Sequence, residues 1–140
     1  MHFDEILKNL PALFSALIVA VLFIQSGLDK VFDRAGNLDW LNGHFSKTFL
    51  SGTVGLTLTA ITFLELATGF LAAVGIIYFF AAGSLVVIFA ASVIGAAAIT
   101  ALFFGQRLAK DYPGAAVLVP YFLLMIVLML LSLPATRPAL

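Results

Sequence analysis

The longest apolar part of the chain leaves few folds open to it. Thr48 to Gln106 spans 59 residues and contains a single charged side chain, Glu65. As one helix, this stretch would be about 88 Å long, roughly three times the hydrocarbon thickness of a bilayer. It must therefore fold back on itself, and we expect two membrane-crossing helices within it.

The amino-acid composition also indicates that the chain resides in a lipid bilayer. Hydrophobic residues make up 63% of the 140 residues, charged residues make up 10%, and the mean hydropathy is +1.16. Soluble domains carry about 25% charged residues. A soluble fold of this size could not bury so much apolar surface, so a soluble enzyme, a disordered chain and a nucleic-acid binder are disfavoured. The lipid bilayer is the expected surroundings.

Two further uncharged stretches, Asn9–Leu28 and Tyr112–Thr136, each allow one more crossing. The sequence therefore predicts an all-α fold, an integral membrane four-helix bundle in one transmembrane domain over residues 1–140. Gly75 and the aromatic residues from Tyr78 onward predict the position of the turn between the second and third membrane-crossing helices. The small residues Ala91 and Gly95 are expected to pack within the bundle. The predicted helices cover approximately residues 10–32, 50–75, 78–104 and 113–133.

The segment Asp33–Lys47 is the one sizeable piece expected outside the membrane. Leu38, Leu41 and Phe45 recur in it at helical spacing, with polar residues between them. This pattern predicts a short amphipathic helix lying in the interface between helices 1 and 2. A structured loop is the alternative.

The basic residues predict an orientation, because cytoplasmic loops are enriched in Lys and Arg. Five basic residues fall on the side of loops 1 and 3, and two fall on the side of the termini. We therefore expect loops 1 and 3 in the cytoplasm and both termini outside. The acidic start of the chain and the lack of a small-residue cleavage motif indicate that the first apolar segment is retained. The five basic residues on the side of loops 1 and 3 are Lys30, Arg34, Lys47, Arg107 and Lys110, and the two on the side of the termini are Lys8 and Arg137.

Glu65 is the most informative residue, because it lies about 15–22 Å from either end of its predicted helix. A charged side chain near the bilayer centre costs at least about 2.5–3.5 kcal/mol. Such groups face the bundle interior and commonly mark functional sites. The structural alternative is a buried hydrogen bond that fixes the register of two helices.

The expected partners of Glu65 lie at the end of the first helix. If the ends of helices 1 and 2 are level, Gln25 lies near the depth of Glu65, whereas Lys30 lies about 13 Å away along the axis. We therefore predict a hydrogen bond between Glu65 and Gln25 or Ser26, with Lys30 reached through water or a ligand. The alternative for Asp29 and Lys30 is that they lie at a helix end and only interact with water at the membrane interface. The candidate binding site is thus Glu65, Lys30, Gln25, Ser26 and Asp29.

The residue inventory limits the chemistry. There is no Cys, which excludes thiol chemistry and thiolate metal sites. His2 and His44 lie far apart in sequence, so no metal site is expected. We predict no catalytic residues and no intrinsic cofactor.

Several short motifs occur in the order that is typical of one family. They are Gly27-x-x-Lys30, then Gly36-Asn37, Trp40-Leu41 and His44-Phe45, then Glu65, Gly69 and Gly75, and finally Asp111-Tyr-Pro-Gly-Ala. Over nearly its whole length the chain resembles the DoxX family of small four-helix membrane proteins. The resemblance makes Lys30 and Glu65 the best candidates for a shared central site, and it implies the bacterial cytoplasmic membrane.

The resemblance also supplies hypotheses about function. Relatives include the small subunit of a thiosulfate:quinone oxidoreductase and proteins of methylamine utilisation, which implies a non-catalytic subunit or accessory protein of a quinone-linked oxidoreductase system. Eukaryotic relatives act in the assembly of other membrane proteins, which implies an assembly or stabilising factor. A small-molecule or proton permease is the third hypothesis. A quinone is the expected ligand on the first of these, and a membrane protein or a second copy of the chain is the expected partner.

Overall fold

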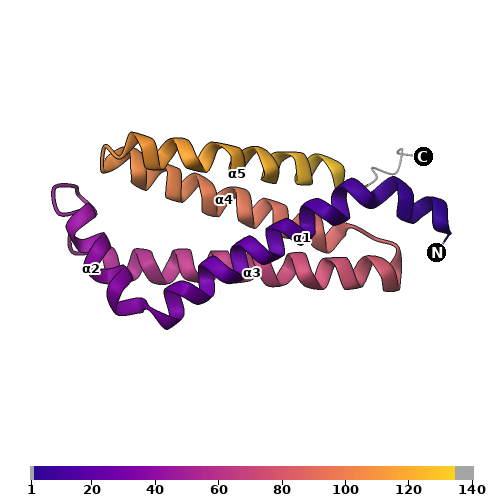
Figure 1. Ribbon diagram of the computed structural model, residues 1–140, viewed down its shortest axis with the longest axis horizontal. Coiled ribbons are helices and arrows are strands. Elements are labelled where there is room, and N and C mark those ends of the chain that lie inside the picture. The colour runs from indigo at the N-terminus through magenta and orange to yellow at the C-terminus, as the bar shows by residue number, and fades with distance from the viewer. Residues whose placement is uncertain (1, 135–140) are drawn as a thin grey trace, which may run out of the picture.

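The computed structural model describes residues 2–134 as a bundle of helices joined by short connections (Figure 1). Four of its helices are long and apolar enough to cross a membrane, and the fifth is a short helix between the first two. The prediction of an all-helical chain with four helices of spanning length is confirmed. In chain order the helices are α1 (Phe3–Phe32), α2 (Arg34–His44), α3 (Val54–Ala82), α4 (Val86–Leu108) and α5 (Tyr112–Leu131).

The four long helices pack in chain order. α1 packs along α3, α3 along α4 and α4 along α5, whereas α1 and α5 meet over a smaller part of their length. Successive long helices run antiparallel, so α2 and the α4–α5 turn lie at one end of the bundle (Figure 1). The start of α1 and the α3–α4 turn lie at the other end.

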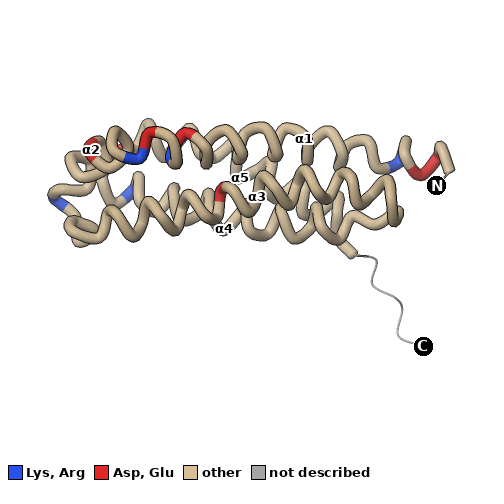
Figure 2. Tube along the Cα trace, turned by 90° about the horizontal axis from the view of Figure 1, so that it is seen from below, with Lys and Arg blue, Asp and Glu red and all other residues tan. Residues whose placement is uncertain are grey.

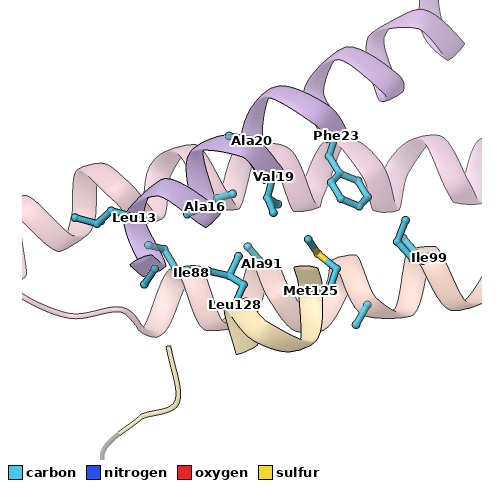
Figure 3. Packing of buried hydrophobic residues seen from close by; sticks show 14 of the residues in the cluster. Leu13, Ala16, Val19, Ala20, Phe23, Ile88, Ala91, Ile99, Met125 and Leu128 are labelled. Atoms are coloured by element: carbon cyan, nitrogen blue, oxygen red, sulfur yellow. The ribbon is translucent and has the colours of Figure 1, made fainter. Parts of the chain in front are cut away.

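Small residues hold the core together, because they let helix backbones approach closely in an apolar solvent. Ala16 of α1 and Ala91 of α4 are completely buried, among larger side chains such as Phe23 and Met125 (Figure 3). A Cβ atom on Gly95 would lie 2.6 Å from Met125 Sδ and 2.8 Å from Thr68 Cγ2. α4 is therefore wedged between α3 and α5, and the predicted packing of Ala91 and Gly95 within the bundle is confirmed.

The turn between the second and third long helices lies at residues 83–85, so its prediction near residues 75–78 is wrong. Gly83 adopts a left-handed backbone (φ +68°), and its N–H donates to the carbonyl of Phe79, which ends α3. Gly75 instead lies mid-helix, where an added Cβ would come within 2.9 Å of the backbone nitrogen of Ile88. The glycine that marked a turn in the sequence is thus a close-packing position between α3 and α4.

A helix, α2, occupies most of the segment expected between the first two crossings. Asp33 begins it, with a carboxylate oxygen that accepts a hydrogen bond from the N–H of Gly36 (3.3 Å). None of the residues of α2 is fully buried. The helix is tied to the bundle at both ends, by Arg34 to α3 and by His44 to α4. Its location at a bilayer interface stays a prediction.

Candidate functional site

Two glycines set the register between α1 and α3. A Cβ on Gly27 would lie 3.3 Å from the backbone nitrogen of Leu66, and one on Gly69 would lie 2.7 Å from that of Ile24. The two helices therefore nearly touch at these levels. Continued along the antiparallel pair, this register places Lys30 two residues, or about 3 Å along the axis, from Glu65.

The resulting contact is a buried ion pair. Lys30 Nζ lies 2.9 Å from Glu65 Oε2, and the Glu65 side chain is 3% exposed whereas that of Lys30 is 19% exposed. Lys30 Nζ also donates to the Ser26 hydroxyl (2.8 Å) and to the Ser26 carbonyl (3.3 Å). The sequence-predicted residues Glu65, Lys30 and Ser26 are thus brought together.

The carboxylate of Glu65 has few other polar neighbours. The hydroxyls of Thr62 and Thr68, on the same helix, donate to the α3 carbonyls of Leu58 and Leu64. Within residues 2–134, Glu65 Oε2 has no hydrogen bond with suitable geometry, so its contact with Lys30 is a charge contact rather than an aligned hydrogen bond. Charge compensation by Lys30 is therefore what makes the buried carboxylate tolerable.

The predicted contact of Gln25 with Glu65 is wrong. Ser26 and Lys30 are four residues apart and face α3, whereas Gln25 and Asp29 lie about 100° around the helix. Both of these side chains are exposed, beside a shallow groove on the outer face of α1. Two of the five candidate residues, Gln25 and Asp29, thus belong to a different surface.

The predicted axial gap between Lys30 and Glu65 is also wrong, and α2 is the reason. The prediction assumed that the first two long helices end at one level. In the observed register, Phe32 at the end of α1 lies level with Ile61, so about seven residues of α3 extend past α1. α2 covers this extension, because Arg34 Nη2 donates to Thr59 Oγ1 (2.8 Å) and to the Gly55 carbonyl (3.2 Å).

A cavity of about 420 Å³ lies at this end of the bundle, between α2, α3 and α4. Lys30 contributes to its lining, and most of the remaining surface is apolar or aromatic, including Phe45 and Phe104. A volume of this size is typical of small-molecule sites, which combine apolar walls with a few polar groups. Lys30 thus takes part both in the ion pair with Glu65 and in the wall of the cavity.

One face of α2 lines this cavity, which the sequence analysis missed. Asn37, Trp40, Leu41 and His44 all contribute to it. Their spacing of three and four residues is that of a single helical face, so the signal was present in the sequence. The sequence analysis instead placed Leu38, Leu41 and Phe45 on the apolar face, and of these Leu41 and Phe45 line the cavity whereas Leu38 does not.

His44 anchors this wall of the cavity. Its Nε2 lies 2.7 Å from Gln106 Oε1 on α4, and its ring stacks on Trp40 with the centroids 4.4 Å apart. Asp111 Oδ2 lies 3.8 Å from the same nitrogen, while Asp111 Oδ1 accepts a hydrogen bond from Gly114 N–H and starts α5. The α2 wall is therefore fastened to the α4–α5 turn.

Most of the basic side chains gather at the cavity end. Figure 2 shows blue and red positions gathered around α2, others at the start of α1, and a red position part-way along the bundle. The one charged residue of α3 is Glu65. Within the described residues, no three side chains of the metal-binding types come together. Comparisons of the chain with protein-family models, curated proteins and solved structures give no match.

Proposed function

We propose that this chain is a DoxX-like membrane protein that binds the headgroup of a quinone beside Lys30. It would serve as a non-catalytic subunit or accessory protein of a membrane oxidoreductase system. The observation that carries the proposal is that Lys30, which Glu65 compensates, contributes to the wall of an aromatic-lined cavity.

The chemistry of the lining fits a neutral carbonyl compound. Glu65 already neutralises Lys30, so the site offers hydrogen-bond donors without the net positive charge that would favour an anion. Asn37 and Gln106 add polar groups, and the aromatic rings provide flat apolar surfaces for a planar ring. A quinone has both features, a planar ring and carbonyl acceptors, together with an apolar tail that suits a bilayer.

The same proposal includes the surroundings of the site. Five basic residues lie at the α2 end, so we infer that this end faces the cytoplasm. α2 then lies near the cytoplasmic interface of a bacterial cytoplasmic membrane. On this proposal, a quinone headgroup enters the cavity from the lipid at this level.

Trp40 provides the test, because it is the one tryptophan of the chain and lines the cavity. Purified protein in detergent is titrated with decylubiquinone while tryptophan emission is recorded. We expect saturable quenching. The variant K30M/E65Q, which removes both charges together, should raise the Kd about 10- to 100-fold, since a charged donor to a ligand carbonyl contributes about 1.5–3 kcal/mol.

The matched control is K47Q, which removes a basic side chain that does not line the cavity. Its Kd should equal that of the parent protein. Linear quenching without saturation, or equal Kd values for the parent and K30M/E65Q, would overturn the proposal.

A further inference from the structure

The end of α1 separates its charges in space. In the sequence Asp29-Lys30 and Asp33-Arg34, each acidic residue is followed by a basic one. Both basic side chains turn toward α3, Lys30 to Glu65 and Arg34 to Thr59. Both acidic side chains are exposed, Asp29 on α1 and Asp33 at the junction between α1 and α2.

Within residues 2–134, no basic side-chain nitrogen lies within 4 Å of a carboxylate oxygen of Asp29 or Asp33. Asp33 is partly satisfied by the N–H of Gly36. Asp29 and its neighbour Gln25 instead border the shallow groove on the outer face of α1. The apolar side chains around them, Val21 and Phe32, are 59% and 82% exposed.

The depth of Asp29 makes this exposure costly in a bilayer. The guanidinium of Arg34 is held at the level of residues 55–59 of α3, whereas Asp29 lies level with Leu64. Asp29 is thus about 8–14 Å deeper than the nearest bound guanidinium. A short carboxylate side chain cannot span that distance, and an unpaired carboxylate in hydrocarbon is unfavourable.

We propose that the outer face of α1 around Gln25 and Asp29 docks a transmembrane helix of another protein that presents a basic side chain at this depth. Charge complementarity selects this partner. A second copy of the chain related by a two-fold axis would place the two Asp29 carboxylates at one depth, facing each other. A basic side chain would instead compensate Asp29, while the Gln25 amide supplies a second interhelical hydrogen bond.

This inference adds a partner surface to the proposed function, but it rests on a different face of the molecule from the cavity. Quinone binding can therefore fail while helix docking succeeds, and the reverse. D29N is expected to bind decylubiquinone like the parent protein, and its unfolding in detergent, followed by the emission of Trp40, shows independently of quinone that the variant is folded.

The test uses the full chain with a donor dye on S84C, reconstituted in phosphatidylcholine vesicles. The acceptor-labelled probe is a designed 24-residue Leu/Ala helix with one lysine about 10 Å from each end, so that either insertion direction works. A helix with leucine at both positions is its control. Energy transfer should show that the lysine helix associates about 5- to 30-fold more strongly than the leucine helix.

D29N should remove this preference, whereas D39N should keep it, because Asp39 is exposed on α2, away from the groove. Equal association of both helices with the parent protein would overturn the proposal. So would a preference that survives in D29N. Energy transfer between two copies of the protein that D29N abolishes, without any preference for the lysine helix, would assign the face to self-association instead.

Discussion

Removing one partner of the Lys30–Glu65 pair should cost much more stability than removing both. K30M keeps an unbranched side chain but leaves the Glu65 carboxylate buried without its counter-charge. Breaking a buried pair in this way costs about 3–5 kcal/mol. In E65Q, the Lys30 ammonium keeps its hydrogen bonds to Ser26 and its partial exposure, so we expect a smaller loss of about 1 kcal/mol.

The double variant K30M/E65Q then shows whether the pair is coupled. With both charges gone, no ion is stranded, so its loss of stability should be lower than the sum of the two single losses by about 2 kcal/mol. Unfolding in mixed dodecyl maltoside and dodecyl sulfate micelles, followed by the emission of Trp40, measures all four proteins under one condition. These unfolding measurements are made without any ligand, so the result of the double-mutant cycle is independent of quinone binding.

S26A is the matched control, because it removes a hydrogen-bond partner of Lys30 and leaves both charges in place. It should cost about 1 kcal/mol. Additive losses in the cycle, with a coupling below about 0.5 kcal/mol, would refute the idea that the pair acts as a unit.

Two further predictions concern packing and orientation. G69A should lower stability by about 1–3 kcal/mol in the same assay, since its Cβ would lie 2.7 Å from the backbone nitrogen of Ile24. G55A has open space around the new methyl group and should lose nothing; equal losses would contradict the register. A membrane-impermeant maleimide should label K47C from the cytoplasmic side and S84C from the opposite side, and labelling of both from one side would refute the four-crossing topology.

Local features of the sequence were enough to predict the long helices. Each helix depends on its own apolar residues, and a bilayer forces every apolar stretch to satisfy its backbone hydrogen bonds internally. Glu65 also stood out by itself, because one charge among 59 residues needs no partner to be noticed. The turn at Gly83 was missed, since a glycine in a sequence does not reveal whether it ends a helix or lets another helix approach.

The residues that meet Glu65 could not be chosen in this way. Gln25 and Lys30 are both near the end of one helix, and their distances to Glu65 depend on how α1 and α3 slide past each other. Close contacts at Gly27 and Gly69 determine the register of the two helices, and α2 covers the part of α3 that extends beyond the end of α1.

The sequence by itself therefore determined the solvent, the number of long helices and the residue around which a site would form. The tertiary structure decided that Lys30 rather than Gln25 compensates Glu65, that a face of α2 lines the cavity, and that Asp29 points outward. The physical reason is that hydropathy and length act within one segment. The register of two helices, and the direction in which each side chain points, arise from the packing of two segments. A shift of one helix by one turn along the other exchanges one neighbouring residue for another.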